Sequence, residues 1–261
     1  MFRFASLGSG SKGNALLVEA GDTRVLLDCG FGPRNLAQRC ARLGIEAATL
    51  DAIIITHEHS DHIGGAFPCA RQYGAALYMT RGTHAAVRDK SAHAAASASP
   101  LDLQLIDSHN AFSIGDLSVQ PFPVPHDARE PVQFVFSDGA RRLGVLTDLG
   151  FSTPHVVEQL SGCDALVLEC NHDADMLASG DYPASLKERI GGRFGHLDNA
   201  SAAALLAQLD RSRLQHVIAA HLSEQNNAPA LAQEALAAVM GCEPDWIGVA
   251  DQALGFEWRH L

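Results

Sequence analysis

The sequence predicts a mixed α/β protein in which two sheets pack face to face and helices cover their outer faces. Short apolar runs alternate with helical segments in the first part of the chain and again after residue 150. Between these parts, residues 101–146 are predicted to form several strands in succession. Hydrophobic residues make up 47% of the 261 residues, so a large core can be buried and wholesale disorder is excluded.

The first part of the chain alternates strands and helices. Apolar, partly β-branched runs predict strands at residues 2–7, 15–19, 24–28, 51–55 and 76–79. A glycine-rich loop at 8–14 follows the first strand, and helices are expected at 33–42, at 61–73 and after Arg81. The stretch 91–100 is rich in Ala and Ser and is expected to be a mobile loop or the end of a helix.

The rest of the chain begins with strands and then alternates again. Strands are predicted at 117–124, 132–137 and 142–146, and a hairpin at 138–140 joins the last pair. Further strands at 165–169 and 214–220 alternate with helices at 154–160, 183–190, 199–209 and 229–240. No Pro/Ser-rich linker or abrupt change of composition divides the chain, so residues 1–261 are expected to form a single domain.

Composition and charge exclude several classes of protein. The chain shows neither a signal peptide nor an apolar segment of membrane-spanning length, so a soluble cytoplasmic protein without a membrane partner is expected. Six cysteines without a Cys-x-x-Cys pair argue against a zinc ribbon, a thioredoxin motif or a disulfide scaffold. The net charge of −11 disfavours nucleic-acid binding through a broad basic face. Carboxylates that bind divalent cations count in that total, however, and are neutralised by the metal.

The most informative motif is His-Glu-His-Ser-Asp-His at 57–62, directly after an apolar strand. In an extended segment alternate side chains point the same way, so His57 and His59 can converge on one ion. The turn that follows carries Asp61 and His62 towards a second ion. Imidazole and carboxylate groups at this spacing predict two adjacent metal sites.

Three further candidate ligands stand where apolar runs end. They are His126, Asp148 and His221. A polar residue in such a place can simply terminate a strand. Three residues of ligand type, together with the 57–62 motif, indicate ligands that complete the two metal sites.

These motifs resemble those of the metallo-β-lactamase-fold hydrolases, and the matched elements span nearly the whole chain. The resemblance implies an αββα four-layer sandwich. It also implies that His57, His59 and His126 hold a first metal, that Asp61, His62 and His221 hold a second, and that Asp148 bridges the two. Oxygen-reducing diiron members have a glutamate where this chain has His59, which favours hydrolysis with two Zn²⁺ or Mn²⁺ ions, and Fe²⁺ also accepts such ligands.

Three further segments resemble the YycJ (WalJ) branch of this family: the loop 8–14, Leu-Glu-Cys-Asn-His-Asp at 168–173 and Gly-His-Leu-Asp-Asn at 195–199. That branch lies near the RNase J and tRNase Z type phosphodiesterases, so the resemblance implies a metal-dependent nuclease, with DNA favoured over RNA. The expected substrate-binding residues are Asn171, His172, His196 and Asn199. Relatives usually have serine where this chain has Asp198. Aspartate and serine are comparable helix N-caps, so the replacement can be structurally neutral.

The expected reaction is an exonuclease-like phosphodiester hydrolysis in which a hydroxide that bridges the metals attacks in line. Asp148 would fix the metal pair, and Asp61 would orient the nucleophile as well as bind metal. His196 would bind the phosphate or protonate the leaving oxygen.

Alternatives remain open at this point. A hydrolase of the same fold acting on a small molecule, such as a cyclic phosphodiester, thioester or lactone, suits the acidic net charge. A non-catalytic binding module would need a lost ligand, whereas all seven ligand positions are filled. The basic cluster of Lys187, Arg189 and Arg193 is either a solvated helix surface or a phosphate contact. The sequence indicates no oligomeric state.

Overall fold

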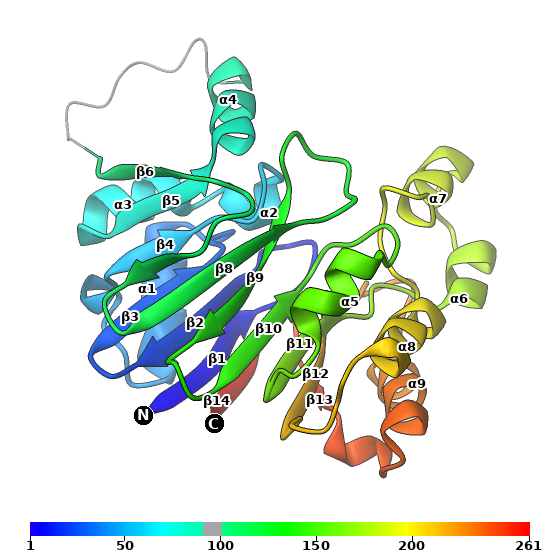
Figure 1. Cartoon of the computed structure of the whole chain (residues 1–261). Coiled ribbons are helices and arrows are strands. Elements are labelled where there is room, and N and C mark those ends of the chain that lie inside the picture. The colour runs from blue at the N-terminus through cyan, green and yellow to red at the C-terminus, as the bar shows by residue number, and fades with distance from the viewer. Residues whose placement is uncertain (91–100) are drawn as a thin grey trace.

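The computed structural model describes residues 1–90 and 101–261, so the Ala/Ser-rich stretch at 91–100 lies outside the described residues. Two β-sheets stand face to face at the centre of the described part (Figure 1). The first has the order β14 (Phe256–His260), β1 (Phe2–Gly8), β2 (Ala15–Ala20), β3 (Thr23–Leu27), β4 (Ala52–Ile54), β5 (Ala76–Thr80), β6 (Leu103–Ile106). The second has the order β13 (Gly248–Val249), β12 (His216–Ala220), β11 (Ala165–Glu169), β10 (Arg142–Leu146), β9 (Val132–Ser137), β8 (Leu117–Pro123), β7 (Phe112–Ile114).

Three apolar clusters hold the layers together. The central cluster, which includes Phe4 and Phe134, lies between the two sheets. The helices α1 (Pro33–Arg42) and α3 (Ala66–Tyr73) pack on the outer face of the first sheet. The helices α5 (Pro154–Leu160), α8 (Asn199–Gln208) and α9 (Pro229–Met240) cover the second sheet. The predicted arrangement of two sheets with helices outside is therefore confirmed. No helix among residues 1–90 and 101–261 is long and apolar enough to cross a membrane.

In each sheet a run of parallel strands brings several carboxyl ends to one edge. Strands β3 to β6 are parallel neighbours in the first sheet, and β10 to β13 are parallel neighbours in the second. Asp28 directly follows β3, His221 directly follows β12, and Asp148 stands two residues after β10. Because the loops at the carboxyl ends of parallel strands lie at the same edge of a sheet, this topology brings Asp28, Asp148 and His221 towards one site.

The prediction of a single helix at 61–73 is wrong. The structure has α2 (Ser60–Ile63) and α3, separated by two glycines. A Cβ atom on Gly65 would lie 1.8 Å from the carbonyl oxygen of Phe31, and the Gly65 N–H donates to the carbonyl oxygen of Cys29 at 2.8 Å. The helix breaks because another segment approaches its backbone closely, and the local helical pattern does not show that contact.

The remaining elements are mostly short. The helices α4 (Arg81–Lys90) and α7 (Ala184–Ile190) agree with predicted helices, whereas α6 (Ala174–Ser179) and the 3₁₀ turns η1 (Ala47–Thr49) and η2 (Pro244–Trp246) were not predicted. Strands β13 and β14 were not predicted either. Strand β14 pairs antiparallel with β1, so the end of the described chain completes the first sheet.

Candidate metal centre

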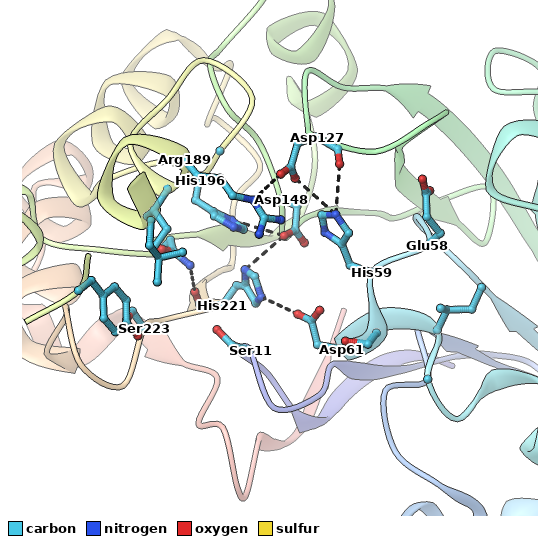
Figure 2. A pocket seen from close by; sticks show the side chains of 18 of the residues that line it. Ser11, Glu58, His59, Asp61, Asp127, Asp148, Arg189, His196, His221 and Ser223 are labelled. Atoms are coloured by element: carbon cyan, nitrogen blue, oxygen red, sulfur yellow. Dashed lines mark hydrogen bonds and ion pairs between the residues drawn. The ribbon is translucent and has the colours of Figure 1, made fainter. Parts of the chain in front are cut away.

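A cavity of about 690 Å³ opens where the carboxyl ends of the strands meet. Its walls come from segments far apart in the sequence, and Figure 2 shows His59, Asp61, Asp148, His196 and His221 grouped around it. The chain therefore places imidazoles and carboxylates from both sheets at one open site.

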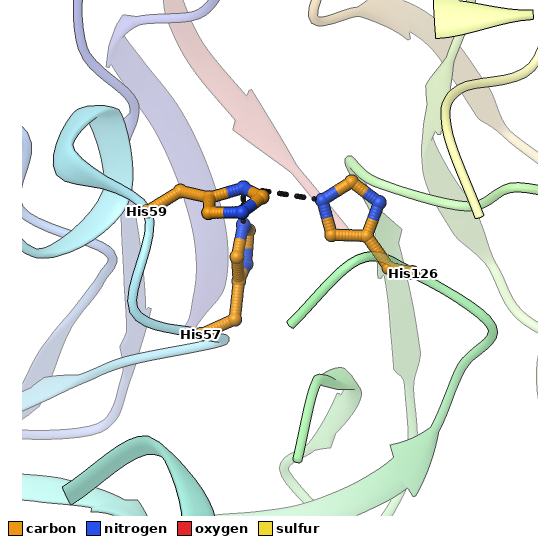
Figure 3. Close-up of side chains that lie close together, drawn as sticks. All are labelled: His57, His59 and His126. Carbon is orange, nitrogen blue, oxygen red and sulfur yellow. Dashed lines mark hydrogen bonds between the residues drawn. The ribbon is translucent and has the colours of Figure 1, made fainter. Parts of the chain in front are cut away.

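The first ligand group consists of His57, His59 and His126 (Figure 3). One nitrogen of each ring faces a fixed partner: Thr56 Oγ1 for His57 Nδ1 at 2.9 Å, the Asp127 carbonyl oxygen for His59 Nε2 at 3.2 Å, and the Gly195 carbonyl oxygen for His126 Nδ1 at 3.0 Å. The two carbonyl oxygens accept hydrogen bonds from the ring N–H groups that face them, and Thr56 Oγ1 can accept one from His57 because its own hydroxyl donates to Asp28. These partners fix the ring tautomers.

The nitrogens left over in this group converge. His57 Nε2 lies 2.9 Å from His59 Nδ1, and His126 Nε2 lies 3.3 Å from the same atom. In the neutral tautomers set by their partners, all three of these nitrogens carry lone pairs. Three imidazole lone pairs directed at one point form a ligand set typical of Zn²⁺ and similar divalent ions.

The second group consists of Asp61, His62 and His221, whose ligand atoms lie within 4.8 Å of one another. Asp61 Oδ2 is 3.2 Å from His62 Nε2 and 3.4 Å from His221 Nε2. The other ring nitrogen of His62, Nδ1, donates a 2.7 Å hydrogen bond to Asp28 Oδ2, which fixes the orientation of the ring. The amide of Asn14 donates to Asp61 Oδ2 at 3.3 Å, which fixes the carboxylate in turn.

Asp148 lies between the two groups. Its Oδ2 is 3.2 Å from His62 Nε2, and its Oδ1 is 3.7 Å from His126 Nε2. The side chain is 2% exposed, and Oδ2 has no hydrogen-bond partner in the described part of the protein. A buried carboxylate oxygen without a hydrogen bond is unfavourable unless a cation compensates it. The donor set and this oxygen therefore fit two divalent cations with Asp148 between them.

Buried charges set the ionisation of the cluster. Burial lowers the pKa of His57 and of His126, which keeps both rings neutral and able to bind a metal. Burial acts in the same direction on His62 and His221, but nearby carboxylates, Asp148 foremost, outweigh it. They raise the pKa of His62 well above its ordinary value and the pKa of His221 to about 10. Without a bound cation, both of these rings carry a positive charge at neutral pH.

Metal binding is therefore expected to release protons from His62 and His221, and metal affinity is expected to rise with pH. A metal ion and a proton compete for the same ring nitrogen. Because the pKa of His221 is raised to about 10, a metal ion must displace a proton from this ring throughout the neutral pH range. Isothermal titration calorimetry in buffers of different ionisation enthalpy measures the protons released at each pH. Metal binding without proton release at pH 7 would contradict this ionisation scheme.

Backbone strain is concentrated at the same site. In the described part of the chain, the only non-glycine residues with positive φ are Asp28, at 59°, and His221, at 55°. Left-handed backbone costs free energy for residues other than glycine and persists where surrounding structure enforces it. His221 is itself a candidate ligand, and Asp28 contacts the candidate ligand His62. The two strained residues therefore both help to form the candidate metal site.

The Asp28→Asn variant is expected to bind metal about 10- to 100-fold more weakly, as is typical when a residue that orients a metal ligand is changed. The asparagine cannot match the charge-assisted hydrogen bond to His62. Metal dissociation constants from competition with a chelating dye measure the effect. Asp22→Asn is the control, because Asp22 is an exposed carboxylate directly before the same strand, at the end opposite to Asp28. Equal affinities in the two variants would show that Asp28 does not support the site.

Four acidic residues at the site were not predicted as site residues: Asp28, Glu169 and, on the cavity wall, Glu58 and Asp127. Asp28 and Glu169 each stand at the end of an apolar run, as Asp148 does, so the same signal marks them in the sequence. Glu169 is fully buried, and its Oε2 accepts hydrogen bonds from the backbone N–H groups of Leu149 and Leu197 at 2.8 and 3.1 Å. It ties two loops of the site together.

The other oxygen of Glu169 orients His196. His196 Nδ1 donates to Glu169 Oε1 at 2.7 Å, and the imidazole lines the cavity with 20% of its side chain exposed. With Nδ1 engaged by a buried carboxylate, Nε2 is the nitrogen left for the cavity. The pair is built like the carboxylate and imidazole pairs that hold a catalytic histidine in one orientation.

The other expected substrate-binding residues differ in whether they line the cavity. Asn171 lines the cavity, and its amide donates to the carbonyl oxygen of His221 at 3.0 Å. His172 and Asn199 are buried and do not line this cavity, and Asn199 exchanges two 2.9 Å hydrogen bonds with Asn227. Their placement favours a structural role over substrate contact.

Asp198 is the N-cap of α8. Its two carboxylate oxygens accept hydrogen bonds from the backbone N–H and the hydroxyl of Ser201, at 2.8 and 2.7 Å. The N-cap prediction for this residue is confirmed. Because both oxygens are engaged at the start of the helix and the residue does not line the cavity, the replacement adds no free carboxylate there.

The basic cluster does not act as one surface. Arg189 lines the cavity, whereas the Lys187 ammonium donates to the carbonyl oxygen of Ala178 at 2.7 Å and the Arg193 guanidinium stacks over Phe151 at 4.9 Å. Only Arg189 of the three is placed to meet a bound molecule in this cavity.

Comparison with known proteins gives a consistent result. Residues 23–221 match the family described as Beta-lactamase superfamily domain. The chain is 34% identical over 238 residues to the exodeoxyribonuclease YycJ of Bacillus anthracis, covering 91% of this chain and 88% of that protein. It is 32% identical over 231 residues to the exodeoxyribonuclease WalJ of Streptococcus pneumoniae serotype 2, covering 88% and 85%. Among solved structures, the metallo-β-lactamase-fold protein YhfI of Bacillus subtilis superposes with a TM-score of 0.76 at 17% identity, covering 99% of this chain and 98% of that one.

Proposed function

The chain belongs to the β-lactamase superfamily, in its YycJ/WalJ-like branch, and from this membership we propose that it is a metal-dependent nuclease that degrades DNA from an end. It is a hydrolase of the metallo-β-lactamase fold, and the named relatives are phosphodiester hydrolases. DNA is proposed over RNA because the two relatives that match along most of the chain are both called exodeoxyribonucleases. We also propose that residues 1–261 form a single domain.

The observation that carries this proposal is the convergence of seven side chains of ligand type, four of which line one cavity together with His196. His57, His59 and His126 would hold one cation, Asp61, His62 and His221 a second, and Asp148 would contact both. His196 remains available for proton transfer. Two divalent cations in these positions, Zn²⁺ or Mn²⁺ with Fe²⁺ as a further candidate, would make a water acidic and polarise the phosphoryl oxygens.

The two carboxylates of the cluster differ in exposure and hence in what they can do. The side chain of Asp61 is 19% exposed towards the cavity, whereas that of Asp148 is 2% exposed. Asp61 can therefore accept a hydrogen bond from the attacking water and direct it at the phosphorus. Asp148 is enclosed by imidazoles, and its role is to hold the geometry of the cluster.

His196 would protonate the leaving oxygen. Its ring lies on the cavity wall, and Glu169 holds Nδ1, so a proton on Nε2 is directed at bound substrate. The buried Glu169 carboxylate holds the ring in one orientation for this transfer. The leaving oxygen of a nucleotide is a poor leaving group unless it is protonated, so proton transfer from His196 would accelerate the cleavage of DNA.

A small-molecule hydrolase is the second candidate function. The net charge of −11 and the carboxylates Glu58, Asp61 and Asp127 on the cavity wall favour a short substrate with little charge over a long polyanion. Such an enzyme would use the same cluster on a cyclic phosphodiester, a thioester or a lactone.

End-labelled oligonucleotides distinguish the two candidates. The protein loaded with Mn²⁺ or Zn²⁺ is incubated with single-stranded DNA, double-stranded DNA and RNA, and products are separated by size. The nuclease proposal predicts progressive shortening of DNA. Hydrolysis of bis(p-nitrophenyl) phosphate together with intact DNA and RNA would favour the small-molecule enzyme instead.

A further inference from the structure

One wall of the cavity carries an apolar stripe that takes no part in the core. Tyr182, Leu186 and Ile190 recur every four residues, the spacing of one helix face, along and just before α7. All three line the cavity. None of them belongs to the three apolar clusters of the described protein, and α7 has no buried residue. The apolar face of this helix is therefore turned to the cavity and not to the protein interior.

The same wall carries a fixed positive charge. Arg189 Nε donates to Asp127 Oδ2 at 2.7 Å, which anchors the guanidinium, and 60% of the side chain is exposed. Figure 2 shows Arg189 beside Asp127 and close to His196. Among the described residues that line the cavity, Arg189 is the only lysine or arginine. With Nε engaged, the two terminal nitrogens of the guanidinium are left to bind an anion.

We propose that this wall binds the nucleotide next to the scissile phosphate. The Tyr182 ring stacks on its base, Leu186 and Ile190 contact the apolar faces of the base and sugar, and Arg189 binds the phosphate on the far side of that nucleotide. The inference rests on the proposed nuclease function and adds to it the residues that recognise substrate.

Two physical reasons favour a nucleotide as the occupant. The cavity combines a cluster suited to phosphoryl oxygens, an apolar stripe and one cation, and these suit the scissile phosphate, the base and sugar, and the next phosphate of a nucleic-acid strand. Stacking on an aromatic ring also requires an exposed base face, which a paired base inside a duplex does not offer. The wall therefore selects an unpaired nucleotide, and single-stranded or frayed ends should be cleaved faster than closed duplex.

The first test compares Arg189→Ala with Lys187→Ala, which removes the same charge from the same helix at a side chain outside the cavity lining. For a single-stranded oligonucleotide, Arg189→Ala should raise KM about tenfold or more through loss of a charge-assisted hydrogen bond, with little change in kcat. It should also flatten the dependence of log KM on log salt by about 0.7, the contribution of one phosphate contact on a single strand. Lys187→Ala should leave both quantities unchanged. An unchanged KM and salt slope in Arg189→Ala would overturn the assignment.

A substrate with one phosphate provides a second readout. Bis(p-nitrophenyl) phosphate has no neighbouring phosphate, so Arg189→Ala should hydrolyse it at close to the wild-type rate. If Arg189→Ala instead loses as much activity on this diester as on the oligonucleotide, Arg189 acts on the metal centre through Asp127, and the proposal fails.

Base stacking is tested by a double-mutant cycle. Wild type and Tyr182→Ala are each assayed on an oligonucleotide with an intact or an abasic nucleotide at the position next to the cleaved bond. Tyr182→Ala should lose about tenfold in kcat/KM on the intact strand, as expected for one base stack, and almost nothing on the abasic strand. Tyr182→Phe should retain activity, and Trp246→Ala, an exposed aromatic away from the cavity, is the control. Equal losses on both strands would refute stacking.

Failure of the inference differs from failure of the function. If wild type cleaves oligonucleotides but the Arg189 and Tyr182 variants behave like their controls, the nuclease stands and this wall does not bind the nucleotide. If wild type hydrolyses bis(p-nitrophenyl) phosphate but no oligonucleotide, the nuclease function fails and the inference fails with it.

Discussion

The Asp148→Asn variant is expected to lose phosphodiester hydrolysis by at least about a thousandfold, because metal catalysis supplies several kcal/mol of transition-state stabilisation. Asp148 contributes the enclosed carboxylate between the two ligand groups, and it lies within 3.7 Å of ring nitrogens from both. An amide carries no charge to balance two cations. His59→Ala is expected to be equally inactive, since it removes one of the three converging imidazoles.

Both variants should keep the fold. Asp148 and His59 are not part of the three apolar clusters that hold the layers together. Far-UV circular dichroism and a cooperative thermal transition check this, and initial rates on bis(p-nitrophenyl) phosphate measure the loss. Full activity in either folded variant would remove the basis for the metal assignment.

The His196→Gln variant is expected to cleave DNA about 10²- to 10⁴-fold more slowly in kcat, the range typical for loss of a general acid. The effect should depend on the leaving group. The nitrophenolate of bis(p-nitrophenyl) phosphate leaves without a proton, so its hydrolysis should fall far less than DNA cleavage. Glu169→Gln should show the same dependence in weaker form, because Glu169 acts through His196 and does not touch substrate.

A matched control and a clear contrary result are available. His109→Gln makes the same change at an exposed histidine on the surface, where 67% of the side chain is accessible, and should leave both activities unchanged. If His196→Gln slows the nitrophenyl ester and DNA by the same factor, His196 does not act as the acid. It would then act in substrate binding or in support of the metal site.

The sequence predicted which side chains converge at the site because its signals are local. The ligands at 57–62 follow one another in a single loop, and His126, Asp148 and His221 each follow an apolar run. Parallel strands explain why such distant residues meet, since their carboxyl ends share one edge of each sheet. The structure brings all seven side chains together, and their role as metal ligands stays a prediction until an ion is measured.

Features set by contacts between distant segments could not be predicted in this way. Asp28 reaches His62 only because β3 and β4 are neighbours, and the helix break at Gly65 depends on the backbone of Phe31. Asn199 stands in a motif with His196, yet its amide turns to Asn227 and away from the cavity. Position in a motif predicted which segments meet at the site, whereas the direction of each side chain needed the structure.

A metal titration tests the central claim of a two-metal phosphodiester hydrolase most directly. Protein stripped with a chelator is titrated with Mn²⁺ or Zn²⁺, bound metal per chain is measured by elemental mass spectrometry, and hydrolysis of bis(p-nitrophenyl) phosphate is followed at each step. We expect no activity in the stripped protein and full activity only as two ions per chain are bound. Full activity in the stripped protein, or at a single bound ion with no further gain, would contradict the claim.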